Sequence, residues 1–324
     1  MLSYVLAVLA ACANATSSVL QRRANRKVPK KQNLSWRLIW SLLHQPVWFS
    51  GIAAICAGFL LQATALDKGQ LSSVEPILIL ELPLTLVLAS RIFGQPMRGR
   101  EWASAGAMTA GLGALLFLLQ PSAGRSDSIR WYIWVIGIAA NLALVGALVM
   151  LGRRASPQDS GGAYRAGLLG VAAGANFGLT AALMKGMTTT LSGGLGQLLT
   201  SWQIYGMIAA GLLGMFLVQS AMNAGGLLAA QPGLTLADPV LSVLWGVLVF
   251  GETVRGGGFI VGEVISLAVV AAAVIALARS PLLSQSEEEP DADQGGDSDL
   301  RQDAALVQEA GQDPGPPEPA PAPR

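Results

Sequence analysis

The chain has 324 residues, of which 52% are hydrophobic and 13% charged, and its mean hydropathy is +0.51. A soluble domain carries about 25% charged residues, so this composition excludes an ordinary soluble protein and indicates one embedded in a lipid bilayer. The net charge of +1 hides an uneven distribution, because 11 of the 20 acidic residues lie in 287–318 and leave a basic body behind. Those bases flank apolar segments, which argues against a nucleic-acid partner.

Nine apolar segments are long enough to cross the roughly 30 Å hydrocarbon core of a bilayer as helices. The connections within 47–90 and 200–249 are very short and predict antiparallel helical hairpins. We therefore predict an all-α, polytopic helical membrane protein. Its transmembrane helices are expected at about 2–20, 47–66, 71–90, 102–119, 131–151, 164–186, 200–222, 226–249 and 258–278.

Basic residues predict the orientation of these spans. The connection that follows the first span carries seven bases and no acid, a pattern typical of cytoplasmic loops. Alternation over nine spans then puts the N-terminus outside and the C-terminal tail inside a plasma membrane. Within the same connection, residues 34–45 have the two-sided pattern of an interfacial helix and contain His44, the single histidine.

The C-terminal segment 284–324 has a different composition from the rest of the chain. It is rich in Glu, Asp, Gly, Ser and Gln and ends in a proline-rich stretch. So few apolar residues cannot form a core, and we expect a disordered cytoplasmic tail. A solubilising tail is the simpler interpretation, and recruitment of a partner protein is the alternative.

Two stretches of the chain repeat each other at a distance of 156 residues, with buried polar residues and prolines in step. Matching positions lie five crossings apart, so the two copies face opposite sides of the membrane. This predicts an inverted-topology repeat of four helices each, in which 1–120 and 164–280 are the copies and 131–151 is a connector helix. The pairs at this distance are Glu75-Pro76 with Gln231-Pro232 and Leu82-Pro83 with Asp238-Pro239. A separate pair, Ala13-Asn14 with Ala175-Asn176, supports the duplication.

Polar residues inside the spans are the candidates for function, because a central Asp costs about 2.5–3.5 kcal/mol to insert. Paired spans interrupted by proline are the best sequence indication of a transport site. Prolines leave backbone carbonyls free to coordinate a cation, although they can also serve only to shape helices for packing. The binding candidates are Asn14, Glu75, Glu81, Asn176, Gln231 and Asp238, and the helix-breaking candidates are Pro76, Pro83, Pro232 and Pro239.

Among these candidates, Glu75 and Asp238 are expected to couple transport to a cation or a proton, and to bind the metal if a divalent cation is carried. Gln231 and the two asparagines are expected to orient the substrate. Glu263 lies only about a turn into its span and is equally consistent with a structural role. No cofactor is expected, and the protein is not expected to be an enzyme, because the sequence holds none of the common catalytic motifs.

Several short motifs, taken in order, resemble the drug/metabolite transporter superfamily (EamA-like). They are Ser17-Ser18-Val19-Leu20-Gln21-Arg22-Arg23, Gly174-Ala175-Asn176 to Lys185-Gly186, Gln219-Ser220-Ala221-Met222-Asn223, Asp238-Pro239 and Phe250-Gly251-Glu252. The layout of four, one and four spans is most similar to the nine-span NIPA-type magnesium transporters. The resemblance implies an inverted-repeat carrier, and superfamily relatives move amino acids, nucleotide sugars, drugs and cations.

We therefore expect a secondary transporter that works by alternating access and moves a small metabolite or a divalent cation such as magnesium. A solute carrier would use the aromatic residues Trp202 and Tyr205 and a less acidic cavity. The alternative is a membrane scaffold or accessory protein that recruits a partner through its acidic tail, and an intramembrane enzyme ranks last. The expected partners are the lipid bilayer and the substrate, and a homodimer is left open.

Overall fold

The computed structural model describes residues 1–25, 46–94, 96–122, 124, 129–154, 161–191, 194–225 and 227–278. Within these residues the chain is helical, and its only β-type pairing is an isolated bridge between Ser122 and Thr253. The expected interfacial helix at 34–45, with His44, and the expected tail at 284–324 lie outside the described residues.

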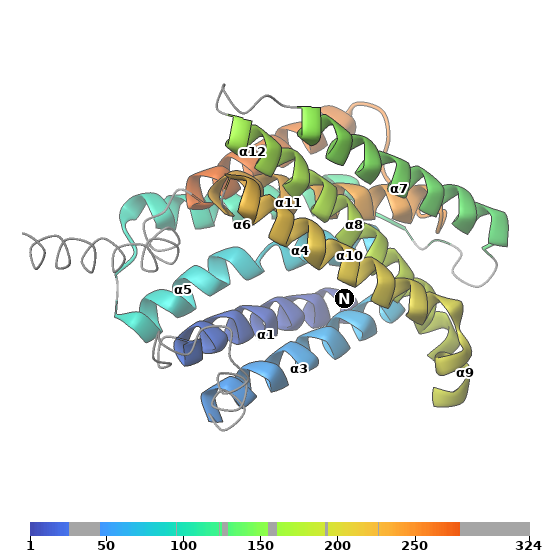
Figure 1. Cartoon of the computed structure of the whole chain (residues 1–324), viewed down its shortest axis with the longest axis horizontal. Helices are drawn as coiled ribbons and strands as arrows, with labels where there is room; N and C mark the ends of the chain where they lie inside the picture. Colours follow the sequence, from blue (N-terminus) through green and yellow to red (C-terminus); the bar gives the residue numbers. More distant parts are fainter. Residues whose placement is uncertain are drawn as a thin grey trace, which may run out of the picture. The chain divides into compact units, whose positions relative to one another are not determined.

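The helices of the described residues follow one another along the chain, from α1 to α12 (Figure 1). They are α1 (Leu2–Asn25), α3 (Pro46–Lys68), α4 (Leu71–Leu78), α5 (Glu81–Phe93), α6 (Gly99–Leu119), α7 (Trp131–Arg154), α8 (Gly161–Leu191), α9 (Leu195–Thr200), α10 (Trp202–Gly225), α11 (Leu227–Leu248) and α12 (Phe259–Ala278).

Each segment predicted to span the membrane coincides with a helix, or in one case with two. In the described part of the chain, eight helical segments are long and apolar enough to cross a membrane, with α4 and α5 counted together. Helix α11 has 22 residues, a length sufficient for one further crossing. The membrane-embedded helical fold is thus confirmed, and the ninth crossing stays a prediction.

The two proline-containing regions that match in sequence differ in structure. In the first, helix α4 ends at Leu78 and α5 begins at Glu81, so Ile79 and Leu80 form a break. Pro83 contributes to this break because it has no N–H group with which to bond the carbonyl of Ile79. In the second, α11 continues through both of its prolines. The prolines therefore interrupt one helix and leave its counterpart continuous.

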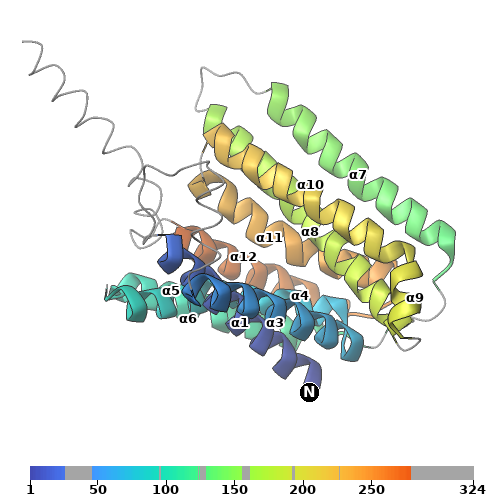
Figure 2. The ribbon, with the colours of Figure 1, turned by 60° about the horizontal axis from the view of Figure 1, so that its bottom comes forward.

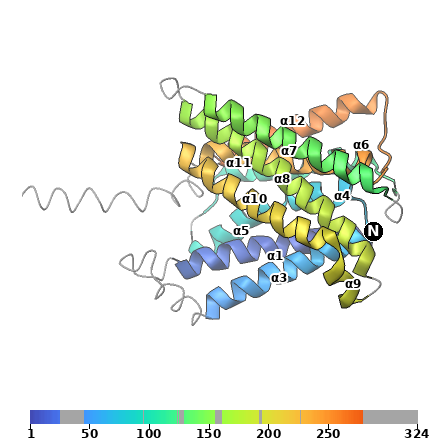
Figure 3. The ribbon, with the colours of Figure 1, turned by 45° about the vertical axis from the view of Figure 1, so that its right-hand side comes forward.

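Helix α8 occupies the centre of the bundle. It packs against α10, α11, α7 and α3, and 72% of its span is buried, compared with 17% for α7. Figures 1 and 2 show α7 along the outside of this group. In the N-terminal half, α1 packs against α3, α4 and α5, and Figure 3 shows α1 and α3 side by side. Contacts of α4 with α11 and of α6 with α12 join the halves.

Helices α8 and α11 approach each other closely because two glycines of α8 face the backbone of α11. A Cβ atom on Gly170 would overlap the carbonyl oxygen of Ala230, and one on Gly174 would overlap that of Leu234. Small residues four apart allow this kind of contact between helices in a membrane, where no hydrophobic driving force draws them together. The close approach positions Asp238, whose backbone nitrogen also lies beside Gly174.

Candidate functional site

A central cavity of about 350 Å³ lies among α3, α4, α8, α10 and α11. Its wall combines acidic and amide groups with aromatic rings and thioethers, which is a mixture suited to a ligand with both a charge and an apolar part. The polar residues of the wall are Gln62, Glu75, Thr180 and Asp238, and the large apolar ones are Phe59, Phe177, Met184 and Met207.

A second cavity of about 310 Å³ shares part of this wall. It is lined by Gln62, Glu75, Phe177 and Asp238, as the central cavity is, and it extends toward α1 and α5. Five of the six predicted binding residues therefore lie at the two cavities. The residues that the second cavity adds include Asn14, Glu81, Gln231, Thr235 and Pro239.

Glu75 lies in α4, just before Pro76, and is only 4% exposed. Its carboxylate accepts a hydrogen bond from the side-chain amide of Gln62 on α3, with 2.9 Å between Nε2 and Oε1. This bond fixes the orientation of the carboxylate at the cavity wall. Gln62 was not among the binding residues predicted from the sequence, and the structure identifies Glu75 as the acid that it contacts.

Asp238 lies in α11, two helical turns after Gln231. Its Oδ1 atom is 3.4 Å from the hydroxyl of Ser242, one turn further along the same helix. Gln231 in turn points its amide to the hydroxyl of Thr235, also at 3.4 Å. Both of these contacts are long for hydrogen bonds, so the polar groups of α11 remain weakly held. Asp238 and Gln231 share one face of α11, as their spacing predicts.

The two remaining acidic and amide candidates near α1 line the second cavity. Glu81 begins α5, and its Oε1 atom accepts a hydrogen bond of 3.3 Å from the hydroxyl of Ser18. Asn14, one turn before Ser18 on α1, is half-buried at the same cavity. These residues lie beside the central site rather than inside it.

Asn176 lies apart from the two cavities. It is fully buried, and its amide nitrogen donates to the carbonyl oxygen of Ala210, which joins α8 to α10. Its side-chain oxygen has no hydrogen-bond partner among the described residues. The aromatic residues Trp202 and Tyr205 are also outside the cavities. The ring of Trp202 packs against Trp134, and the hydroxyl of Tyr205 donates to the carbonyl of Leu199.

No basic side chain of the described residues neutralises Glu75 or Asp238. The two ion pairs in that part of the chain join Lys68 to Asp67 and Lys185 to Glu252. A buried carboxylate needs a compensating base, proton or cation. Nor do the described residues contain a group of three His, Cys, Asp or Glu side chains that could hold a metal ion. The cavity thus offers two uncompensated acids in a largely apolar wall.

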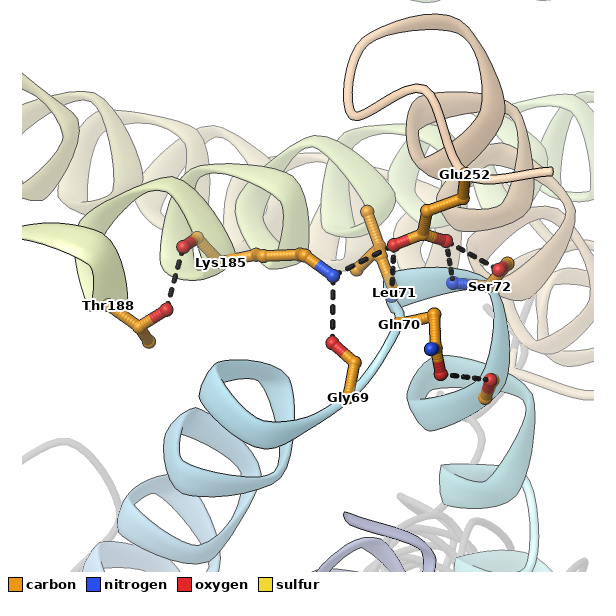
Figure 4. Close-up of polar contacts among 8 residues, drawn as sticks. Gly69, Gln70, Leu71, Ser72, Lys185, Thr188 and Glu252 are labelled. Atoms are coloured by element: carbon orange, nitrogen blue, oxygen red, sulfur yellow. Dashed lines mark hydrogen bonds and ion pairs between the residues drawn. The ribbon is translucent and has the colours of Figure 1, made fainter. Parts of the chain in front are cut away.

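A second buried polar cluster, which we did not predict, lies at the N-terminal end of α4 (Figure 4). Lys185 of α8 and Glu252, which follows α11, form an ion pair of 2.8 Å, with side chains that are 6% and 0% exposed. In the sequence, Glu252 drew attention only as part of the Phe250-Gly251-Glu252 motif. A lysine near the end of an apolar segment was a signal for a buried pair, but nothing local in the sequence identified its partner.

These helices and their polar cavity define a polytopic helical membrane protein. No protein-family profile matches the chain, and no solved structure matches it. Over 257 residues the chain is 31% identical to an uncharacterized protein of Corynebacterium glutamicum, and the match covers 78% of this chain and 87% of that protein. The chain belongs to the same family as that bacterial protein.

Proposed function

We propose that the protein is a secondary transporter that works by alternating access, with the central cavity as its substrate site. One observation carries the proposal: Glu75 and Asp238 line a common cavity inside apolar helices and have no basic partner among the described residues. Burying an acid in a membrane is costly, so such acids usually serve a substrate, an ion or a proton. A scaffold has no need of them.

The contacts between helices support an inverted repeat. Helix α8 packs against α10 and α11 much as α1 packs against α3, α4 and α5, and the counterpart pairs α4–α11 and α6–α12 also contact each other. A repeat of this type places its substrate site where the halves meet. In this proposal α7 is the connector, nine helices cross the plasma membrane, and the tail is cytoplasmic. The resemblance to drug/metabolite transporters agrees with the proposal.

The wall of the central cavity favours a small organic cation over magnesium as the substrate. The rings of Phe59 and Phe177 can attract a cation through their faces, and the thioethers of Met184 and Met207 adapt to an irregular apolar body. Magnesium instead demands an octahedral set of oxygens at short distance. In a cavity of about 350 Å³ with two carboxylates, a bare metal ion would contact only a small part of the wall.

The proposal is tested by uptake into proteoliposomes that contain the purified full chain, under an imposed proton gradient. Phenyltrimethylammonium serves as the organic cation probe and is compared with magnesium in parallel vesicles. We expect saturable uptake of the organic cation. Uptake of magnesium alone would replace the substrate class and keep the transporter, whereas uptake of neither probe by the folded protein would contradict the proposed site.

The scaffold alternative is tested by removing residues 284–324. A transporter whose site lies among α3, α4, α8, α10 and α11 should keep its uptake rate without the tail. If the truncated protein takes up the probe normally in vesicles but cannot replace the full chain in cells, the tail recruits a partner.

A further inference from the structure

The buried ion pair of Lys185 and Glu252 joins segments that are far apart in the sequence. Glu252 caps the first turn of α4: the N–H of Leu71 donates to its Oε1 at 2.7 Å, and the N–H of Ser72 donates to its Oε2 at 3.0 Å. The Ser72 hydroxyl also donates to Oε2. The N-cap residue, Gln70, makes no side-chain cap of its own. A residue from beyond α11 therefore supplies the negative charge that the α4 N-terminus favours.

Lys185 approaches the same point from α8. Its Nζ donates to Oε1 of Glu252 and to the carbonyl oxygen of Gly69, both at 2.8 Å (Figure 4). It also lies 5.2 Å from the centre of the Phe250 ring. The ammonium therefore ties α8 to the turn between α3 and α4, as well as to the chain after α11.

The two members of the pair are held very differently. Without Lys185, Glu252 would retain three donors from Leu71 and Ser72. Its segment is also fastened to the end of α6, where Ser122 and Thr253 form a β-bridge and the Arg255 N–H bonds to the Leu119 carbonyl. Lys185, in contrast, contacts that segment through its ammonium group, which bonds to Glu252 and lies over the Phe250 ring.

The pair lies next to the central cavity. Met184, which precedes Lys185 on α8, lines that cavity. Glu75 lies about one helical turn, roughly 5 Å, from Ser72 along α4. The surrounding side chains, among them Leu71, Met184 and Phe250, belong to one buried apolar cluster. The pair thus lies where α8 meets the start of α4, beside the wall of the central cavity.

We propose that Lys185 is the releasable half of a latch that closes this end of the central cavity, with Glu252 as its fixed half. Release of the ammonium frees α8 from the α3–α4 turn, while Glu252 keeps its cap on α4. The inference rests on the proposed transport cycle for its purpose. Its test measures access to the cavity rather than transport, so the latch and the transporter can fail separately.

The test uses a single cysteine in place of Thr180, which lines the cavity, in the full chain with Cys12 and Cys56 replaced by alanine. A membrane-impermeant methanethiosulfonate reagent is added to one face of sealed vesicles, and then to the other face in vesicles of opposite orientation. In Lys185→Met protein we expect labelling about tenfold faster than in the parent, from one face only. Lys185→Arg, which keeps the charge, should stay near the parental rate.

Lys68 supplies the matched control, because it forms an ion pair of similar length, 2.9 Å, in an exposed position at the end of α3. Lys68→Met should leave the labelling rate unchanged. If Lys185→Met does not fold because Glu252 is left without a counter-charge, the double variant Lys185→Met/Glu252→Gln removes both charges and should show the same acceleration. Folded protein of either variant that labels at the parental rate from both faces would overturn the latch.

Discussion

Two acidic clusters in the described part of the chain have opposite arrangements. Glu252 is paired with a lysine and accepts hydrogen bonds from two backbone N–H groups and a hydroxyl. Glu75 and Asp238 line a cavity, and among the described residues each accepts a side-chain hydrogen bond, from Gln62 at 2.9 Å and from Ser242 at 3.4 Å. A satisfied carboxylate holds structure in place, whereas an uncompensated one can bind. Burial alone therefore does not identify a site.

The largest expected effect comes from neutralising a cavity acid. Asp238→Asn should lower uptake of phenyltrimethylammonium into proteoliposomes by at least about 100-fold, equivalent to about 2.7 kcal/mol, because the cation loses a buried counter-charge. Asp67→Asn is the matched control, since Asp67 is an acid at the surface end of α3, and should retain full uptake. Equal losses in the two variants would mean that general charge, rather than the cavity, drives uptake.

The second prediction concerns the cluster around Glu252 and leaves the residues of the central cavity unchanged. A Cβ atom on Gly246 would overlap Oε2 of Glu252 and lie 3.3 Å from the backbone nitrogen of Ser72. Gly246→Ala should lower stability by about 1–3 kcal/mol, read as a lower midpoint of thermal unfolding in detergent. Gly113 on α6 has open space around it, so Gly113→Ala should be neutral or slightly stabilising. A Gly246→Ala protein as stable as the parent would contradict the structural role of Glu252.

A third change weakens the hold on Glu75 without removing its charge. Gln62→Leu deletes the amide that donates to Glu75. A hydrogen bond to a charged group contributes about 1.5–3 kcal/mol. The low end of that range corresponds to a fall of about tenfold in affinity for the cation probe, measured as a higher half-saturation concentration for uptake. Gln70→Leu, at the turn after α3, is the control and should not change this concentration. A lower half-saturation concentration in Gln62→Leu would indicate that the amide competes with the substrate for the acid.

The smallest effect is expected at Ser242. Its hydroxyl lies 3.4 Å from Asp238, at the outer limit of a hydrogen bond. Ser242→Ala should therefore raise the half-saturation concentration by about threefold or less, or roughly 0.6 kcal/mol. A loss comparable to that of Asp238→Asn would show that the serine holds the acid far more firmly than this distance indicates.

The helices and the cavity acids were accessible from the sequence for definite reasons. Membrane-length apolar runs predict helices because, in lipid, only a helix satisfies all the backbone hydrogen bonds within a single segment. The repeat at 156 residues directed attention to Glu75 and Asp238, and both line the central cavity. The break between α4 and α5, set against a continuous α11, was not accessible, because similar prolines occur in both. The local sequence does not show whether packing against neighbouring helices will keep a proline-containing helix continuous.

The cluster around Lys185 and Glu252, and the contacts of Asn176, could not be predicted from the sequence. Lys185 and Glu252 are 67 residues apart, and Glu252 is 180 residues from Ser72. No periodicity links positions at such distances, so only the packing of α8 and α11 brings them together. Asn176 matched Asn14 in the repeat, yet it bonds to α10 while Asn14 lines a cavity. Equivalent residues in a repeat need not share a role.

The contrast between the two clusters is tested most directly by carbodiimide labelling of the purified full chain. Dicyclohexylcarbodiimide adds to protonated carboxyl groups in apolar surroundings, and peptide mass spectrometry then identifies the residues that carry the adduct. We predict adducts at Glu75 or Asp238, slowed by phenyltrimethylammonium, while Glu252 stays unmodified because its oxygens are occupied by Lys185 and by donors from Leu71 and Ser72. Modification of Glu252 as readily as the cavity acids, or no adduct at either cavity acid, would contradict the account.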